Sequence, residues 1–283
     1  MWKAYRVVFK LKSPLHIGCG KVGNLQRTRP YVMGRAFWGA LTMRLTRDKH
    51  QPATDSRHYS DIGEKVNKEL TYTYFYPAIH NTNNNDYDIA FPWNHENQFC
   101  RRFLSSYVST ALVYPQQAAN EGLLHEVEFL SPRTLDRGEQ VYLVGYVFEK
   151  EGCSLEWREA CQKLQIGGER GYGWGDLKYI KSQEIVDTQL FDGNCHWREQ
   201  EGFILIEVSE SKHLLAHSVA QKVFVQGEIE PLVGREWRSH NSTNRYAGQH
   251  LEKFCEPCWV PGSKVGQSSA FVIQEFGIWQ AND

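Results

Sequence analysis

Apolar and polar positions alternate along the first stretch of the chain and then change to a helical spacing. The alternation over residues 4–12 predicts a strand with one solvated face. Over residues 35–47 apolar side chains recur three and four positions apart, which predicts an amphipathic helix. Its predicted buried stripe consists of Ala36, Phe37, Ala40, Leu41 and Leu45. Arg44 falls inside this stripe, so we expect its long side chain to extend out of the core.

The pattern after this helix predicts mostly strands. Residues 48–65 are polar and have no clear period, which indicates a loop with one short helix. Residues 70–79 are rich in Tyr, Thr and Phe and are predicted to form a strand. Residues 103–114 fit a helix or a strand equally well. The further predicted elements are strands at 124–130, 140–148 and 177–180 and a short helix at 155–164.

The order of these elements is strand, helix, two strands, helix, strand. This is the βαββαβ order of ferredoxin-like folds, whose sheet has one open face that many RNA-binding modules use. We therefore predict an α+β protein with a modified ferredoxin-like, RRM-like domain over residues 1–182. Residues 183–283 contain strand-like runs and little helix, which predicts a β-rich C-terminal domain. A degenerate ferredoxin-like fold is one form that this domain could take.

The composition is that of an ordinary globular protein, with 41% hydrophobic and 23% charged residues. The sequence has no run of about eighteen apolar residues, so no transmembrane helix is predicted. Its first residues resemble neither a signal peptide nor a transit peptide. We therefore expect a cytoplasmic protein without a membrane partner.

The formal net charge of −1 conceals a strong asymmetry along the chain. Residues 1–49 hold eleven Lys or Arg and one acid, a balance of +10, whereas the remaining residues carry a balance of −11. Because ionic screening acts over roughly 8 Å at physiological salt, a basic N-terminal face would attract a polyanion despite the neutral total. The alternative is that folding scatters these charges over several faces.

A glycine-rich segment at residues 165–175 is the most distinctive stretch of the sequence, with five glycines among eleven residues. Such density is usual where the backbone takes positive φ or approaches a ligand closely, and successive N–H groups there can hold an anion. Arg170 supplies a charged donor, and Tyr172 and Trp174 supply faces for base stacking. A mobile surface loop or a bulged hairpin is the alternative, because the segment matches neither a dinucleotide fingerprint nor a P-loop.

A second glycine-spaced segment lies near the N-terminus and is followed by basic residues. Its predicted RNA-binding members are Gly18, Gly20, Lys21, Arg27 and Arg29. Arg35 lies in the first turn of the predicted helix, where the dipole disfavours cations but backbone N–H groups point at anions. An arginine at that position is best explained by a phosphate nearby.

Seven cysteines at irregular spacing indicate reduced thiols rather than a disulfide framework. Cys255 and Cys258 have the spacing of half a zinc site, which Cys195-His196 or His250 would have to complete. Because no second pair of this spacing occurs, we predict no metal and no other cofactor.

Several of these stretches together resemble the repeat-associated mysterious protein (RAMP) superfamily of CRISPR systems. The resemblance rests on residues 13–20 with 31–41, on 166–175, and on 230–237 with 259–263. It covers most of the chain, and it is closest to the subunit that binds the guide-RNA handle in type III effector complexes of the III-D kind. The resemblance implies a glycine-rich loop that contacts guide RNA. It also implies two kinds of partner, a large polymerase-like subunit and backbone RAMP subunits.

Carried over to this sequence, the resemblance assigns the RNA-contacting glycines to Gly167, Gly168, Gly171, Gly173 and Gly175. Arg170 becomes the phosphate contact, and Arg35 would begin the first helix near the same groove. The family usually has a proline before the glycine that corresponds to Gly34, but this sequence has Met33 there. This difference leaves the role of Arg35 open.

The superfamily also includes ribonucleases, so catalytic residues have to be considered. His16, Tyr31 and Arg35 would supply a metal-independent acid–base set for RNA cleavage, whereas the alternative for His16 is a loop histidine bonded to backbone. A subunit that cuts target RNA would instead use an acid in a flexible loop. The candidates for that acid are Asp48, Asp55 and Asp61, which otherwise are solvated loop residues.

We predict a non-catalytic subunit of a CRISPR type III effector complex that binds the repeat-derived 5′ handle of the guide RNA in antiviral defence. Three alternatives remain open. The chain would be an endoribonuclease that processes guide-RNA precursor, a backbone subunit that cleaves target RNA, or a protein–protein scaffold.

Overall fold

The computed structural model describes residues 1–115, 117–220, 224–236, 250–253 and 256–282. Its first sheet has the strand order β12-β1-β11-β5-β6, with β4 also paired to β11, and all of these neighbours are antiparallel. The strands are β1 (Trp2–Leu11), β4 (Leu70–Tyr72), β5 (Tyr76–Asn81), β6 (Asp86–Ile89), β11 (Val141–Lys150) and β12 (Leu177–Ile185).

Helices cover one face of this sheet. The helical elements are α1 (Gly34–Lys49), α2 (Ser56–Glu69), α3 (Glu96–Phe103), α4 (Trp157–Cys161) and two 3-10 turns, η1 (Arg170–Tyr172) and η2 (Glu275–Gly277). Helix α1 buries Phe37 and Leu41 against Phe9 of β1, as the helical spacing predicts. Arg44 reaches the helix surface and bonds Asp48 one turn later, with Nε–Oδ2 at 3.1 Å.

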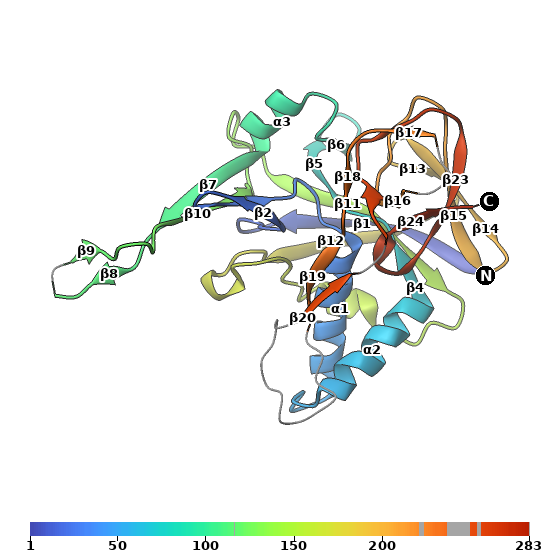
Figure 1. Cartoon of the computed structure of the whole chain (residues 1–283). Coiled ribbons are helices and arrows are strands. Elements are labelled where there is room, and N and C mark those ends of the chain that lie inside the picture. Colours follow the sequence, from blue (N-terminus) through green and yellow to red (C-terminus); the bar gives the residue numbers. More distant parts are fainter. Residues whose placement is uncertain (116, 221–223, 237–249, 254–255, 283) are drawn as a thin grey trace.

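A second, four-stranded sheet has the order β2-β3-β10-β7 and extends into a long arm. Its strands are β2 (Gly18–Val22), β3 (Leu25–Thr28), β7 (Leu104–Ser109) and β10 (His125–Leu130). The tip of the arm is the small hairpin of β8 (Leu112–Val113) and β9 (Ala118–Ala119), which projects away from the body (Figure 1).

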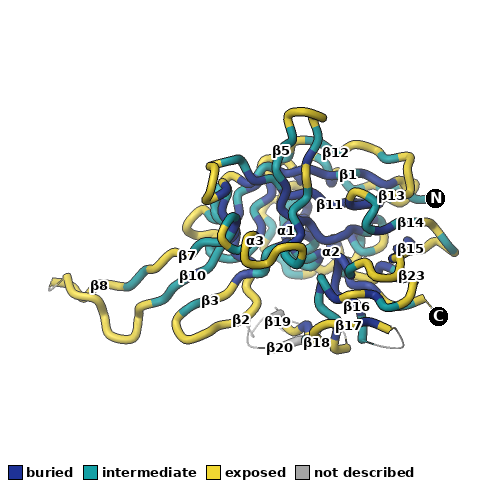
Figure 2. Tube along the Cα trace, turned by 90° about the horizontal axis from the view of Figure 1, so that it is seen from above, coloured by how far each residue is buried: buried dark blue, intermediate teal, exposed yellow. Residues whose placement is uncertain are grey.

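The C-terminal half is β-rich. Its eight-stranded sheet consists of β13 (Gln189–Leu190), β14 (Cys195–Gln200), β15 (Phe203–Val208), β16 (Ser218–Val219), β18 (Ile229–Glu230), β21 (Cys258–Trp259), β23 (Ser269–Ile273) and β24 (Trp279–Ala281). Two further pairs join β17 (Val225–Gln226) to β22 (Lys264–Val265) and β19 (Val233–Glu236) to β20 (His250–Lys253). The N-terminus and the last described residues both lie on the side of the molecule opposite the arm (Figures 1 and 2).

The prediction of an open sheet face is wrong, because the C-terminal half covers the face of the first sheet that the helices leave free. One core cluster joins Tyr74, Tyr76 and Tyr146 of the first half to Phe191 and other apolar residues of the second. All three tyrosines bond across the boundary: Tyr74 to the His217 ring at 2.8 Å, Tyr76 to the Leu215 carbonyl at 2.7 Å, and Tyr146, whose hydroxyl accepts from the Phe191 N–H, at 3.1 Å. Residues 4–12 therefore have no solvated face, and both sides of β1 are buried.

The α+β class is confirmed, and the strands at 4–12, 124–130 and 140–148 and the helix at 35–47 are present. The exact βαββαβ layout is not confirmed. Along the chain, β2 and β3 are inserted between β1 and α1. Helix α3 and the arm are inserted between β6 and β11. The domain boundary after residue 182 stays a prediction, and β12 runs across it.

Two local predictions need correction. The short helix predicted within residues 48–65 is present but longer, because α2 runs from Ser56 to Glu69, and the loop is confined to residues 50–55 because α1 continues to Lys49. Asp55 caps α2 by accepting the Arg57 N–H at 2.9 Å, and only Ile62, Gly63 and Val66 of this helix are buried. The predicted strand at 70–79 is divided into β4 and β5. No helix in the described part of the chain is long and apolar enough to span a membrane.

Candidate RNA interface

The glycine-rich loop at residues 166–175 is closed by hydrogen bonds at both ends. The Ile166 N–H donates to the Gly175 carbonyl at 2.9 Å, and the Gly175 N–H donates to the Pro14 carbonyl at 2.7 Å. Gly175 has φ +75°, and a Cβ at this position would lie 1.8 Å from the Ile166 carbonyl oxygen. Glycine is required here by close backbone approach within the protein itself.

The first glycines of this loop pack against the N-terminal loop. The Gly168 N–H donates to the His16 carbonyl at 2.8 Å, and a Cβ on Gly167 would lie 2.4 Å from the same oxygen. Gly167 has φ +91°, a region that only glycine enters at little cost. The two glycine segments that the sequence singles out therefore form one continuous surface.

The tip of the loop carries the groups that face solvent. Glu169 has φ +54°, η1 follows it, and a Cβ on Gly171 or Gly173 would meet no atom within 4 Å. Among the described residues, the N–H groups of Glu169, Arg170 and Gly171 have no hydrogen-bond acceptor. Three consecutive N–H groups in such a turn form the kind of concavity that binds anions.

The three large side chains of the loop differ in their exposure and in their contacts. Arg170 is exposed, and its Nη1 lies 3.3 Å from the Met43 sulfur. Tyr172 is 79% exposed and presents its ring to solvent. Trp174 instead packs edge-on against Phe129 of β10, with ring centroids 5.1 Å apart. Tyr172 is therefore available for stacking on a base, whereas Trp174 anchors the loop to the foot of the arm.

His16 contacts both the glycine-rich loop and the start of the β2–β3 hairpin. Its ring is 5% exposed, and Nδ1 lies 2.7 Å from the Glu128 carbonyl oxygen, to which it donates. A Cβ on Gly168 would lie 3.1 Å from His16 Cδ2, and a Cβ on Gly18 would lie 3.2 Å from Nε2. The geometry matches the backbone-bonded alternative for His16.

The other N-terminal candidates divide into exposed and buried groups. Gly18, Gly20, Lys21 and Arg27 are exposed on the β2–β3 hairpin. Arg29 is largely buried, and its Nη1 donates to Glu230 Oε1 at 2.7 Å. Hydrogen bonding to Glu230 raises the pKa of Arg29 although burial opposes this, so the guanidinium remains charged. Arg29 serves an internal ion pair rather than the outer surface.

Glu230 and Arg29 belong to a polar network between the two halves of the chain. The fully buried His217 donates from Nε2 to Glu230 Oε1 at 2.5 Å, and its Nδ1 accepts the Tyr74 hydroxyl at 2.8 Å. Burial lowers the pKa of His217 and outweighs the nearby carboxylate, so we assign a neutral imidazole. Burial would raise the pKa of Glu230, but the bonds from His217 and Arg29 outweigh it and hold this pKa at about 2.

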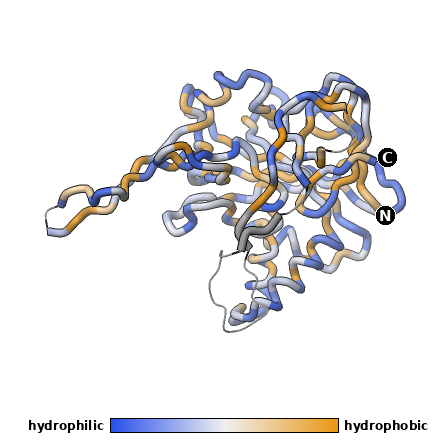
Figure 3. The backbone as a smooth tube through the Cα atoms, in the orientation of Figure 1, coloured by the Kyte–Doolittle hydropathy of each residue, from blue (hydrophilic) through white to orange (hydrophobic). Residues whose placement is uncertain are grey.

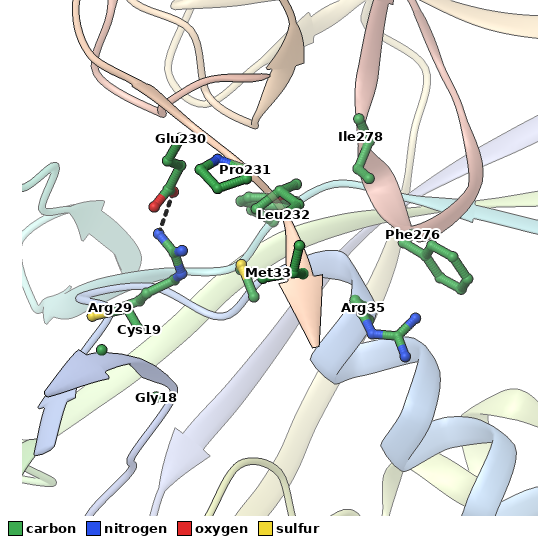
Figure 4. A pocket seen from close by; sticks show the side chains of 13 residues that line it. Gly18, Cys19, Arg29, Met33, Arg35, Glu230, Pro231, Leu232, Phe276 and Ile278 are labelled. Carbon is green, nitrogen blue, oxygen red and sulfur yellow. Dashed lines mark hydrogen bonds and ion pairs between the residues drawn. The ribbon is translucent and has the colours of Figure 1, made fainter. Parts of the chain in front are cut away.

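A pocket of about 290 Å³ lies beside this network (Figure 4). Its lining comes from Gly18 and Gly20 of β2, Arg29, Met33, Arg35, Tyr74, the turn at Glu230, Pro231 and Leu232, and Phe276 with Ile278. The pocket therefore brings residues of the first and the last of the family-like stretches together.

Arg35, which lines this pocket, is half-buried and packs on aromatic rings. Its guanidinium lies 4.9 Å from the centre of the Phe276 ring and 5.8 Å from that of Trp38. Burial lowers its pKa to about 10, so it is still charged at neutral pH. A Cβ on Gly34 would lie 2.2 Å from the Phe276 carbonyl oxygen, so η2 covers the start of α1. The contact of Arg35 with a phosphate stays a prediction.

The catalytic candidates are not arranged for acid–base chemistry on an external substrate. Tyr31 is buried among Tyr74, Tyr76 and His217, and burial raises its pKa to about 12. His16 is likewise buried and bonded to backbone.

The acids proposed for a target-cutting loop lie in or at helices. Asp48 is in α1 and pairs with Arg44 and, at 3.5 Å, with Lys163. Asp55 caps α2, and Asp61 lies inside that helix. Asp48 and Asp61 are thus held in helices, and Asp55, the last residue of the loop before α2, has its carboxylate bonded to Arg57.

The half zinc site cannot be assessed in full, because Cys255 lies outside the described residues. Cys258 is buried and its thiol donates to the Glu256 carbonyl, with 3.3 Å between the sulfur and the oxygen. The described residues contain no group of three or more His, Cys, Asp or Glu side chains arranged to hold a metal ion.

The basic excess of residues 1–49 is partly neutralised by folding. Five of its eleven cations pair with carboxylates: Arg6 with Asp86, Lys12 with Asp176, Arg27 with Glu128, Arg29 with Glu230, and Arg44 with Asp48. Four of these acids come from the later, acidic part of the chain. The sequence pattern could not reveal this, because the partners lie far apart along the chain.

Comparisons with known proteins give similarity at low identity. No family model and no curated protein matches the sequence. In a type III-B Cmr-beta complex bound to cognate target RNA and AMPPnP, one chain is similar with a TM-score of 0.49 and 10% identity, over 92% of this chain and 85% of that chain. Similar chains occur in the apo state of Cmr-beta, with a TM-score of 0.40, 10% identity and 65% and 98% coverage, and in the complex with cognate target RNA, with a TM-score of 0.38, 12% identity and 62% and 96% coverage. All three TM-scores are below 0.5, so these similarities do not establish the fold or the function of this chain.

Proposed function

We propose that this chain is a non-catalytic, guide-RNA-binding subunit of a CRISPR type III effector complex in the cytoplasm. It would hold the repeat-derived 5′ handle and assemble with a large polymerase-like subunit and RAMP backbone subunits in antiviral defence. The observation that carries this proposal is the joint surface of the two glycine segments. There the N–H groups of residues 169–171, for which the described residues offer no acceptor, lie in the same turn as the exposed Arg170 and Tyr172.

Each group of this surface suits one part of an RNA strand. N–H groups and a guanidinium bind phosphate oxygens without regard to sequence. An exposed tyrosine ring stacks on an unpaired base, an interaction worth about 1–3 kcal/mol. The β2–β3 hairpin, whose Gly18 contacts the same His16 ring as Gly168 of the loop, carries the exposed Lys21 and Arg27. The surface therefore suits a single strand better than a duplex groove.

The ribonuclease alternative is less well supported, because His16 and Tyr31 are buried and engaged inside the protein. The alternative of a target-cutting subunit is less well supported because its candidate acids lie in or at helices. A protein–protein scaffold would explain the packed glycines but not the outward-facing N–H groups.

The test is binding of a labelled, repeat-containing guide precursor in EDTA, read as gel shift and as cut products. Arg170→Ala should weaken binding and reduce the dependence of log Kd on log salt by about one, because one phosphate contact is lost. Arg137→Ala, which removes another exposed arginine far from the loop in sequence, is the matched control and should change neither quantity. An unchanged salt slope in Arg170→Ala would remove this residue from the site.

Cleavage is tested in the same gel with His16→Asn. The asparagine amide can replace the Nδ1–H that donates to the Glu128 carbonyl but cannot accept or release a proton near neutral pH. A shift without cut products supports the proposal. Cut products that His16→Asn abolishes would make the protein a processing ribonuclease. Neither shift nor cleavage would favour a scaffold.

A further inference from the structure

One corner of the first sheet lies beyond the cover of the C-terminal half. The core cluster shared with that half includes Ala4 of β1 and Tyr146 of β11. Farther along the same face is a separate cluster to which the described part of the C-terminal half contributes no residue, and its members are Val8, Ala78, Tyr87 and Val144. Next to this cluster lie the end of β1 and the start of β12, which is the strand at the edge of the sheet.

Three lysines gather at this corner. Lys10 of β1 and Lys178 of β12 lie directly opposite each other in the antiparallel ladder, so their side chains leave the same face side by side. Lys181 is paired with Val8 next to a bulge, and its Nζ lies 5.6 Å from the centre of the Tyr87 ring on that face. Lys178 is exposed, and the other two lysines are half-buried. Hydrophilic and hydrophobic positions alternate along β12, which can be followed in Figure 3.

Aromatic rings lie beside these lysines. Tyr142 of β11 is the partner of Lys10 on the other side of β1, and its ring centroid lies 4.9 Å from that of Tyr87. His80 of β5 joins the group, with its ring centroid 5.1 Å from that of Tyr87. Tyr142 and His80 remain partly exposed. Surfaces that bind single-stranded nucleic acid combine cations and accessible rings in this way.

The positive charge of the corner is not neutralised within the protein. None of the three lysines has a carboxylate partner among the residues that the structure describes. Two acids near this face, Asp86 and Asp192, gather around Arg6 instead. Like charges directly opposite each other destabilise a sheet, so the pairing of Lys10 with Lys178 has a cost that a bound anion would remove.

We propose that this corner is a second contact surface for single-stranded RNA, formed by Lys10, Lys178, Lys181 and Tyr142. The lysines bind phosphate oxygens, and Tyr142 contacts an unpaired base. The corner lies on the face opposite the glycine-rich loop, whose Arg170 contacts Met43 of α1. Only two residues separate Gly175 of that loop from Lys178, so a strand that passes around the edge of β12 reaches both surfaces. The inference rests on the proposed function for the class of its ligand, but it uses none of the residues of the loop.

The test is titration of the full chain with a labelled single-stranded RNA of mixed sequence at several salt concentrations. Lys10→Gln and Lys178→Gln should each lower the slope of log Kd against log salt by about one, because each removes one phosphate contact. Lys3→Gln is the matched control and should leave the slope unchanged, since Lys3 is an exposed lysine of β1 at a position that faces the other side of the sheet. Tyr142→Leu should weaken binding at least about fivefold at an unchanged slope.

Photo-crosslinking separates this inference from the proposed function. The same RNA with thiouridine in place of uridine is irradiated with the protein, and the crosslinked peptides are identified by mass spectrometry. Crosslinks at both Tyr172 and Tyr142 support both surfaces. Crosslinks at Tyr172 alone would overturn the second surface and leave the proposed function standing, and crosslinks at Tyr142 alone would do the reverse. Crosslinks at neither residue would overturn both.

Two further results would contradict the proposal. A slope that falls as much in Lys3→Gln as in Lys10→Gln would show that net charge, rather than the position of the lysines, determines the affinity. The other result is full RNA affinity of Tyr142→Leu together with binding of polyglutamate that Lys10→Gln and Lys178→Gln abolish. This combination would assign the corner to an acidic protein segment.

Discussion

Replacing Glu230 by glutamine should remove a pH-dependent part of the stability. The carboxylate accepts from both Arg29 and His217, and the bond from Arg29 joins the N-terminal half to β18 of the C-terminal half. Glutamine retains an accepting oxygen and the shape of the side chain but removes the charge. Glu230→Gln therefore isolates the contribution of the charge to the free energy of unfolding.

The magnitude follows from the pKa of the carboxyl group. A fall from 4.5 in the unfolded chain to about 2 in the folded one corresponds to about 3 kcal/mol, as an upper estimate. Because the folded pKa is lowered, this stability is present above pH 4.5 and is lost as the pH falls toward 2. Burial also lowers the pKa of His217, and the Glu230 carboxylate offsets part of this effect, so stability falls as the pH drops below the unfolded pKa of 6.5.

The assay is urea unfolding of both proteins, followed by tryptophan fluorescence at pH 7 and at pH 3. The difference in unfolding free energy between wild type and Glu230→Gln should narrow from about 3 kcal/mol at pH 7 to about 1 kcal/mol at pH 3. Glu207→Gln is the control, because Glu207 pairs with Arg198 at 2.6 Å on the exposed surface and should cost less than about 1 kcal/mol at either pH. A difference for Glu230→Gln that does not change with pH would refute the reasoning.

The remaining predictions concern glycines that close backbone contacts require. Gly175→Ala should lower stability by about 2–4 kcal/mol and disorder the loop, because its φ is +75° and the new Cβ would lie 1.8 Å from the Ile166 carbonyl oxygen. Gly171→Ala meets no atom within 4 Å, so a melting temperature that falls as far as that of Gly175→Ala would contradict this explanation. Gly34→Ala should lower the melting temperature by separating α1 from the Phe276 carbonyl, and an unchanged value would show that η2 does not rest on the helix start.

The elements predicted from sequence were those whose pattern is local and strong. The stripe of α1 and the alternation in β10 and β11 decide which side chains are buried, so periodicity finds them. The bounds of helix α2 were not predicted, because three buried positions in fourteen residues make a narrow stripe and its polar residues look like those of a loop. β1 was assigned a wet face because its sequence does not reveal that the distant C-terminal half covers it.

The candidate site was predicted in outline and not in its contacts. Glycine density located both loops, since backbone that approaches other backbone closely has few alternatives to glycine. The role of Arg29 was not predictable, because its partner Glu230 lies 201 positions away and no periodicity connects such residues. Trp174 was predicted to stack on RNA bases, but whether an aromatic side chain faces solvent or a neighbouring strand depends on the fold.

The covered sheet face changes which aromatic residues a bound RNA could use. In an open sheet, Tyr74, Tyr76 and Tyr146 would be the stacking platform, but here each is buried and hydrogen-bonded to the C-terminal half. Any RNA contact must therefore use the margin of the sheet, where Tyr172 is the exposed ring of the glycine-rich loop. A binding surface made of backbone N–H groups contacts phosphates and therefore accepts many RNA sequences. Selectivity for particular bases would depend on the few side chains beside that surface.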